Sequence, residues 1–311
     1  MSKILLTGAA GYIGSTLTSK LLKNSHEVIA IDNFMYNQQS LLDCCHYKAL
    51  KVVRGDARNR DLISRHIKDV DIIIPLAGIV GAPACDKDPI AAQGVNLDAI
   101  KMILELRRPE QKIIYPDTNS GYGIGQKDIY CDENTPLNPI SLYGKVKVEA
   151  EKIILEAGNA VVFRLATVFG ISPRMRIDLL VNDFIYRAVN DRFIVLFESH
   201  FKRNYIHVRD VARAFIYAID NFERMKNEPY NIGLSDANLN KMELCEEIKK
   251  QLPDFYFVEA KIGEDVDKRN YIVSNAKIEK LGFKTEISLQ DGIAELIKGY
   301  QVLKRNQFSN I

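Results

Sequence analysis

The sequence has 311 residues, about twice a typical domain, which is enough to bury a full hydrophobic core without disulfides or metals. Its 42 Lys and Arg nearly balance 40 Asp and Glu, and a formal charge of +2 supplies no general field for capturing nucleic acid or an anionic membrane. With 47% hydrophobic and 26% charged residues, the composition excludes disordered and fibrous proteins.

The five cysteines show no metal-binding spacing, although Cys44 and Cys45 are adjacent. An odd number of cysteines in this pattern predicts reduced, intracellular thiols. The first apolar run is too short for a signal peptide and ends in glycines, and no run approaches the roughly 18 apolar residues of a membrane span. We therefore expect a cytoplasmic protein with no nucleic-acid or membrane partner and no bound metal.

Short β-rich apolar runs alternate with amphipathic stretches from residue 3 to about 170, which predicts an α/β fold with a parallel sheet covered on both faces. The predicted strands span 4–7, 27–32, 51–54, 71–76, 112–116 and 161–167. The predicted covering helices span 13–23, 61–67, 97–106 and 142–156.

The pattern becomes irregular after residue 170, where predicted helices at 179–189, 208–222, 241–251 and 289–300 alternate with shorter strand-like pieces. This indicates a smaller second α/β domain. We assign residues 1–170, with about 208–233, to the doubly wound sheet and residues 171–207, with 234–311, to the smaller domain. A crevice between two such parts is the default place for a ligand.

A glycine-rich loop, Thr-Gly-Ala-Ala-Gly-Tyr-Ile-Gly at residues 7–14, joins the first strand to the first helix. Gly8 permits a tight turn, Gly11 allows a pyrophosphate to approach the backbone, and Gly14 allows close helix packing. The helix N-terminus adds amide donors. The loop predicts a dinucleotide-binding Rossmann fold, with Tyr12 and Ile13 also at the cofactor.

Asp32 ends the second predicted strand, where a carboxylate would accept hydrogen bonds from an adenosine ribose. The same carboxylate would repel a 2′-phosphate, and the neighbouring Asn33, Phe34 and Met35 offer no cation to offset that repulsion. NAD is therefore expected rather than NADP, with Asn33 beside it. The alternative is a structural glycine turn with Asp32 as an ordinary strand-end residue.

Tyr143 and Lys147 lie four residues apart in a predicted helix and therefore on one face. A phenol with a pKa near 10 is a poor base at neutral pH, but a neighbouring ammonium and a positive nicotinamide ring stabilise the phenolate. We expect Tyr143 to remove a hydroxyl proton while hydride leaves the same carbon for NAD. Lys147 is expected to lower the Tyr143 pKa and to bind the nicotinamide ribose. A chance pair on a helix face is the alternative.

The glycine spacing, the Tyr-x-x-x-Lys pair, and the segments Gly-Asp-Ala at 55–57 and Leu-Ala-Gly at 76–78 resemble one family over essentially the whole chain. It is the extended branch of the short-chain dehydrogenases/reductases, the NAD-dependent nucleotide-sugar epimerases and dehydratases. The resemblance implies that Asp56 accepts a hydrogen bond from the adenine, although a plain turn carboxylate is an alternative. It places four further residues at the cofactor: Ala57, Leu76, Ala77 and Gly78. Pro75 stands where relatives often have His.

Residues 115–123 resemble the family segment whose hydroxyl, four residues before the Tyr of Tyr-Gly, shares the substrate proton. That residue is Thr118, with Ser120 as the alternative. Family 4,6-dehydratases follow this Thr with Asp and Glu, because elimination of water requires an additional acid and base. Asn119 and Ser120 are not carboxylates, so we expect oxidation and reduction at C4 without dehydration.

Residues 202–210 resemble the family segment in which an Arg binds the substrate diphosphate, and Arg203 holds that position. His207 in the same segment is expected to order the start of a helix. The resemblance assigns the smaller domain to the nucleotide sugar. The implied substrate contacts are Thr118, Asn119, Ser120, Arg174, Arg176, Asn182, Arg203 and Arg269. A solvated charge cluster is equally open for Arg269.

The leading hypothesis is a 4-epimerase of a nucleotide-diphosphate sugar that acts through a 4-keto intermediate, in surface-polysaccharide sugar biosynthesis. Residues 118–125 and 164–184 also resemble bacterial enzymes that oxidise GDP-heptoses at C4, so a net C4-dehydrogenase is the alternative. A 4,6-dehydratase and a non-catalytic NAD-binding protein are further alternatives. The family implies a homodimer through the helices 97–106 and 142–156, where Val148, Ile153 and Ile154 fit either a dimer seam or an internal core.

Overall fold

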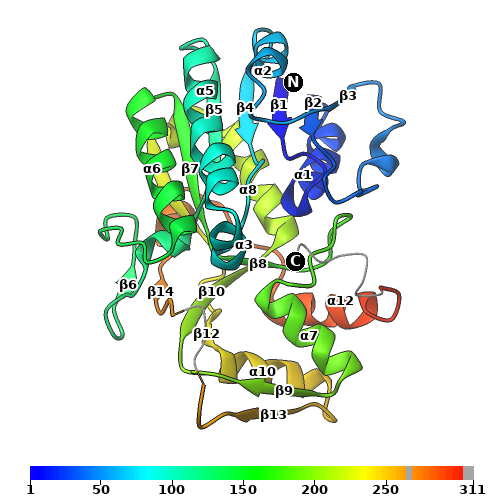
Figure 1. The fold of residues 1–311 in the computed structure, drawn as a ribbon, viewed down its shortest axis with the longest axis vertical. Helices are drawn as coiled ribbons and strands as arrows, with labels where there is room; N and C mark the ends of the chain where they lie inside the picture. Colours follow the sequence, from blue (N-terminus) through cyan, green and yellow to red (C-terminus); the bar gives the residue numbers. More distant parts are fainter. Residues whose placement is uncertain (264–267, 304–311) are drawn as a thin grey trace.

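A seven-stranded parallel sheet forms the centre of the computed structural model, which describes residues 1–263 and 268–303 (Figure 1). The strand order is β11-β7-β5-β4-β1-β2-β3. The strands are β1 (Lys3–Thr7), β2 (Glu27–Asp32), β3 (Leu50–Arg54), β4 (Ile72–Pro75), β5 (Lys112–Thr118), β7 (Ala160–Leu165) and β11 (Glu228–Ile232). β4 and β7 are buried at every residue, and β1, β2 and β5 at all but their end residues, as a sheet covered on both faces requires. The predicted doubly wound α/β fold is confirmed.

Two groups of helices cover the two faces of this sheet. One face packs against α1 (Tyr12–Lys23) and α8 (Val208–Asp220), and the other packs against α2 (Arg60–Ile67), α5 (Ala99–Leu106) and α6 (Leu142–Ala157). Shorter turns complete this part of the molecule: η1 (Leu42–Cys44), α3 (Ala82–Lys87), α4 (Pro89–Gln93), η2 (Gly94–Asp98), η3 (Asn119–Tyr122), α9 (Phe222–Met225) and α11 (Ala276–Lys280).

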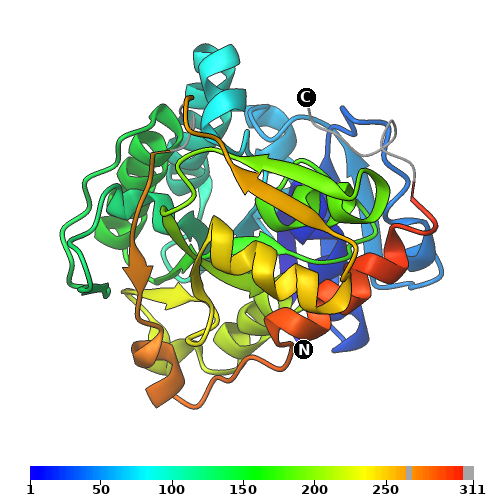
Figure 2. The ribbon, with the colours of Figure 1, turned by 90° about the horizontal axis from the view of Figure 1, so that it is seen from below.

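A second layer lies at the carboxyl ends of the strands, below the sheet in Figure 1. It contains α7 (Leu180–Asn190), α10 (Lys241–Gln251) and α12 (Leu289–Gly299), and its apolar core is separate from the two cores of the sheet. Figure 2 shows α10 (yellow) and α12 (red) side by side in this layer. Three small sheets accompany it: β8 (Thr167–Phe169) with β10 (Lys202–His207) and β12 (Asn238–Asn240), β9 (Phe193–Leu196) with β13 (Tyr256–Glu259), and β6 (Tyr130–Cys131) with β14 (Ile272–Val273).

Four details differ from the sequence-based prediction. The strand predicted at 161–167 breaks at Ala166, because β7 pairs within the large sheet whereas β8 pairs with β10. The helix predicted at 97–106 is π-helical up to Asp98, and the helix predicted at 208–222 ends at Asp220. β11 was not predicted, and its Pro229 is tolerated because β11 is an edge strand.

The three residues considered for a dimer seam lie on α6. Ile154 is fully buried in the core between α6 and the sheet, and Ile153 packs against the same core. The exposed surface of α5 and α6 carries charges instead, including an ion pair of 3.2 Å between Lys101 of α5 and Glu149 of α6. Ile153 and Ile154 therefore serve the internal core, and the homodimer stays a prediction.

Two general features bear on the expectations from composition. All five cysteines are free thiols, and only Cys45 is exposed. Within residues 1–263 and 268–303, no helix is both long enough and apolar enough to cross a bilayer.

The packing of α8 on the sheet gives a test of the fold. Phe215 is fully buried and meets Phe163 of β7 edge to face at 5.2 Å between ring centroids. Phe215→Ala should lower the free energy of unfolding by about 3–5 kcal/mol, because it leaves a cavity in a close-packed core. Urea unfolding measures this change. The control Ile90→Ala removes a side chain that is 86% exposed and should change the same quantity by less than about 0.5 kcal/mol; equal effects of the two variants would contradict the assigned packing.

Candidate active site

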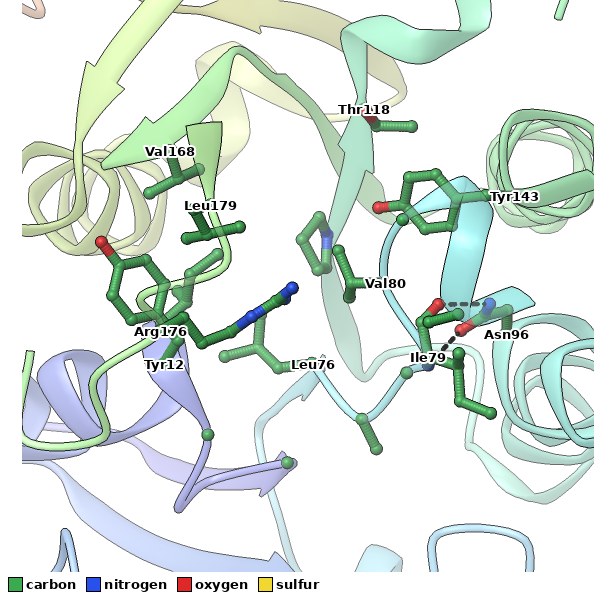
Figure 3. A pocket seen from close by; sticks show the side chains of 18 of the residues that line it. Tyr12, Leu76, Ile79, Val80, Asn96, Thr118, Tyr143, Val168, Arg176 and Leu179 are labelled. Atoms are coloured by element: carbon green, nitrogen blue, oxygen red, sulfur yellow. Dashed lines mark hydrogen bonds between the residues drawn. The ribbon is translucent and has the colours of Figure 1, made fainter. Parts of the chain in front are cut away.

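A cavity of about 670 Å³ opens at the carboxyl ends of β1, β4 and β5. The connections from β1 and from β4 leave in opposite directions here, and ligands of doubly wound sheets bind at this switch point. The glycine loop, the segment after β4, the start of α6 and the second layer all contribute walls (Figure 3).

The glycine loop is shaped by contacts that exclude side chains. Gly8 has a φ of +67°, and a Cβ there would lie 2.6 Å from the amide nitrogen of Ala77. A Cβ on Gly14 would lie 2.1 Å from the carbonyl oxygen of Gly8. α1 begins directly after Gly11, which makes no side-chain cap. The first-turn amides of α1 therefore remain available to a phosphate, as the loop motif predicts.

Asp32 ties the end of β2 to the glycine loop. One carboxylate oxygen accepts a hydrogen bond of 2.9 Å from the Ala10 amide, and the other accepts bonds from the Phe34 amide at 2.8 Å and the Gln38 side chain at 3.2 Å. Asp32 also lines the cavity, together with Asn33. Asp32, which is predicted to bind the ribose, is thus held in place by the glycine loop, which is predicted to bind the pyrophosphate.

Asp56 and Ala57 line the cavity next to Asp32, as predicted. Asp56 makes a bidentate ion pair with Arg58, whose shorter contact is 2.7 Å, and this hydrogen bonding holds the Asp56 pKa below its usual range. Arg58 also lines the cavity. The sequence prediction missed Arg58 because no motif includes it.

The loop after β4 forms another wall of the cavity, in the part where the cofactor is predicted to bind. Leu76, Ala77 and Gly78 line the cavity, as predicted. Asn96 braces this loop, since its side chain donates to the Ile79 carbonyl at 2.9 Å and accepts from the Ile79 amide at 3.1 Å (Figure 3). A Cβ on Gly78 would lie 2.6 Å from the Asn96 side-chain oxygen, so the loop and its brace fit together only with glycine.

Tyr143 and Lys147 both line the cavity from α6, and the Tyr143 hydroxyl points into it (Figure 3). Burial raises the Tyr143 pKa, and the positive charges that lower it belong to Arg269 and Arg176. The Lys147 ammonium instead donates 2.5 Å to the Pro116 carbonyl. Both residues therefore line the cavity, and the cations that lower the Tyr143 pKa in this structure are the two arginines; the roles predicted for Lys147 stay predictions.

Thr118 and Ser120 both line the cavity at the end of β5. The Thr118 hydroxyl donates 2.9 Å to the Ser120 hydroxyl, which also accepts a hydrogen bond from Arg269. Both hydroxyl candidates therefore stay open. Asn119 does not line the cavity, because it is 1% exposed and turned inward.

Four arginines predicted from the sequence reach the cavity, namely Arg174, Arg176, Arg203 and Arg269. Arg176 extends into it from the side opposite Tyr143 and is paired with Asp178 at 2.5 Å (Figure 3). Lys241 adds a further cation that the sequence prediction missed. Asn182 does not reach the cavity: it is fully buried and donates 2.7 Å to the Arg176 carbonyl, so it supports the arginine loop.

His207 orders the start of α8, as predicted. Its Nδ1 accepts a hydrogen bond of 3.2 Å from the Arg209 amide, and the ring is fully buried. Burial lowers the His207 pKa to about 4, which keeps the imidazole neutral at physiological pH. This histidine is therefore a helix cap.

A glycine loop, a ribose-binding position and a Tyr-Lys pair around one cavity define a dinucleotide-dependent enzyme of the short-chain dehydrogenase/reductase type. Residues 4–233 match the NAD dependent epimerase/dehydratase family, and the chain belongs to it. The protein is an NAD-dependent enzyme of the nucleotide-sugar 4-epimerase and dehydratase family.

Relatives and solved structures align over nearly the full length of the chain. A putative UDP-glucose 4-epimerase from Methanocaldococcus jannaschii is 28% identical over 94% of this chain and 97% of its own. An uncharacterized UDP-glucose epimerase of Bacillus subtilis, YtcB, is 30% identical over 95% and 96%. The UDP-glucuronic acid 4-epimerase from Bacillus cereus, solved with UDP-glucuronic acid and NAD, has a TM-score of 0.84 at 25% identity, covering 96% of this chain and 99% of that one.

Asp32→Asn should weaken NAD binding by about 10- to 150-fold, because an amide replaces a carboxylate whose hydrogen bonds are each worth about 1.5–3 kcal/mol. Isothermal titration calorimetry with NAD measures the dissociation constant. The control Asp43→Asn changes an exposed carboxylate in η1 and should leave it unchanged. An unaltered affinity in Asp32→Asn would remove Asp32 from the cofactor site.

Proposed function

We propose that the enzyme oxidises a nucleotide-diphosphate sugar at C4 to a 4-keto intermediate and reduces this ketone from the opposite face, giving the 4-epimer. One observation carries the proposal: Tyr143 and Thr118 line the same cavity as the glycine loop and Asp32, the Tyr143 hydroxyl points into it, and several cations lie on its walls. A phenol and a second hydroxyl beside a dinucleotide site suit proton transfer at a carbinol carbon.

The residues of the cofactor half fit NAD, since the loop has no room for side chains at Gly8 and Gly14 and Asp32 disfavours a 2′-phosphate. NAD supplies a hydride acceptor at this site when it is bound. Tyr143 takes the proton of the C4 hydroxyl, and Thr118 or Ser120 orients that hydroxyl. Lys147 lies one helical turn beyond Tyr143 and contributes a positive charge at the same wall.

The sugar nucleotide lies toward the second layer in this proposal. Arg174, Arg176 and Arg203 contribute guanidinium groups to that part of the cavity, and a guanidinium grips phosphate oxygens bidentately. We assign cofactor binding to residues 1–170 with 208–233, and sugar-nucleotide binding to residues 171–207 with 234–311. Substrate binding then joins the two layers around the reacting carbon.

The geometry favours oxidation and reduction over dehydration. Asn119 is buried away from the cavity, and Ser120 presents a hydroxyl rather than a carboxylate. Asp117 is 3% exposed and interacts with Glu151 of α6. Elimination of water across C5 and C6 requires an acid and a base at the sugar. Asp117 lines the cavity, but its buried carboxyl group interacts with Glu151, and Asn119 and Ser120 supply no carboxylate.

Tyr143→Phe should lower kcat by about 100- to 10,000-fold, the usual contribution of a general base, while NAD still binds. Epimer formation from candidate nucleotide sugars, followed by chromatography, measures the rate, and calorimetry measures the cofactor affinity. The control Tyr130→Phe alters a tyrosine that is 55% exposed and should retain full activity. Full activity in Tyr143→Phe would refute the assigned base.

Product analysis separates the epimerase from a net dehydrogenase, which uses the same residues. The purified enzyme is incubated with a nucleotide sugar and a slight excess of NAD, and the products are resolved by mass spectrometry. An isomer of unchanged mass, without accumulating NADH, is the expected result. A stable ketosugar two mass units lighter, with an equal amount of NADH, would show that oxidation is the net reaction.

A further inference from the structure

Four ionisable side chains lie together at the wall of the cavity that carries Tyr143, and two of them, Asp117 and Lys147, line the cavity. Asp117 of β5 and Arg164 of β7 are paired in the strand register, while Lys147 and Glu151 lie one turn apart on α6, which packs over these strands. All four are less than a tenth exposed. Two acids and two bases are thus buried beneath the helix that carries Tyr143.

Arg164 is occupied by partners other than Asp117. It forms a bidentate ion pair with Glu151 through contacts of 3.0 and 2.6 Å, and its remaining nitrogen donates 3.1 Å to the Tyr122 hydroxyl and to the Glu133 carbonyl. Glu151 therefore has a dedicated cation and stays ionised, and the Glu151 pKa lies below its usual value.

Asp117 has no such cation of its own. In the part of the chain that the structure describes, neither of its carboxyl oxygens meets an N–H or O–H donor. It interacts with the Glu151 carboxylate, and two carboxyl groups form a hydrogen bond only when one of them holds a proton. Arg164 favours the ionised form of Glu151, so Asp117 is the member of the pair that favours the protonated form. Burial and Glu151 raise the Asp117 pKa well above its usual range.

Lys147 is the other group whose charge this cluster affects. Its ammonium lies 3.8 Å from the centre of the Tyr115 ring and donates to the Pro116 carbonyl. Burial lowers the Lys147 pKa to about 8, whereas Asp117 and Glu151 raise it. The other titratable or charged groups around this wall are Tyr115 on β5, Tyr143 on α6, Arg164 on β7, Cys85 on α3, and Arg176 and Arg269 from the second layer.

We propose that Asp117 is a positioning residue that keeps the Lys147 ammonium charged as the solution becomes alkaline. The proposal rests on the role given above to the Tyr143 and Lys147 pair. When Asp117 releases its proton to solvent, the new carboxylate attracts the ammonium and favours the charged form of Lys147. Without Asp117, Lys147 becomes neutral at a lower pH, and the positive charge at the reacting wall is lost.

The same arrangement makes Asp117 a cost to stability at neutral and alkaline pH. An acid whose pKa is raised by folding holds a proton that the unfolded chain releases, so its contribution to stability is lost as pH rises through the folded-state pKa. Asn has the shape of the protonated acid and does not ionise. Glu151 has the opposite role, because its loss leaves the buried Arg164 guanidinium unpaired.

The decisive experiment is a titration of Lys147 in Asp117→Asn and in the wild type. Protein labelled with ¹³C at the lysine Cε is followed by NMR against pH, and the Lys147 signal is identified by its loss in Lys147→Arg. We expect the Lys147 signal of Asp117→Asn to titrate on the order of one pH unit lower than that of the wild type. The alkaline limb of the kcat profile should move in the same direction.

Thermal melting distinguishes this role from a merely structural one. The Tm of Asp117→Asn relative to wild type should increase from pH 5 to pH 8, whereas Glu151→Gln should melt below wild type throughout. Asp117→Ser repeats the comparison if Asp117→Asn does not fold. An unshifted Lys147 titration, or a relative Tm of Asp117→Asn that falls as pH rises, overturns the proposal.

Neither the NMR titration nor the melting curves require turnover. Absence of any C4 product from the wild type would count against the proposed function alone, and these two measurements would still decide the role of Asp117.

Discussion

The cavity wall that carries Tyr143 also holds a buried amine. The Lys147 ammonium donates a hydrogen bond to the Pro116 carbonyl and lies over the Tyr115 ring. β4 pairs with β5 only as far as Ile73, so β5 continues beyond its neighbour on that side, and the Pro116 carbonyl accepts the ammonium. A proline fits here because the strand has left its ladder with β4. The early end of β4 thus opens the cavity and also creates the acceptor for Lys147.

On the side of the cavity that we propose for the sugar nucleotide, other groups of the protein hold the arginines in place. Arg176 is held by Asp178, Arg203 donates 2.9 Å to the Lys202 carbonyl, and Asn182 fixes the backbone at Arg176. Guanidinium groups that are ordered in advance lose less conformational entropy when they bind an anion. The second layer therefore orders its cations in advance, which suits the diphosphate binding that we propose there.

The sequence predicted those features that depend on neighbours along the chain. The glycine loop, Asp32 and the Tyr143 pair each have a local signature, because a strand, a turn and a helix in succession fix their geometry. The break at Ala166 and the strand β11 were not predicted, since each depends on a pairing partner distant in sequence. Asn182 was predicted at the substrate, but its side chain is buried, accepts a hydrogen bond from the Gly170 amide and donates one to the Arg176 carbonyl, and it does not line the cavity.

Asp117 shows why the residue preferences of a strand do not predict every residue of such a site. An aspartate on a buried strand face opposes the preferences of a sheet interior, and a protein that needed only a core would have an apolar residue there. Its neighbours Glu151 and Lys147 on α6 account for it in the proposal above, because a negative charge on Asp117 at high pH favours the charged form of the Lys147 ammonium. Conflicts between local preference and the surrounding fold are expected where function opposes stability. In this proposal, the buried Asp117 carboxyl lowers the stability of the folded protein at high pH, and it extends the pH range over which the Lys147 ammonium stays charged.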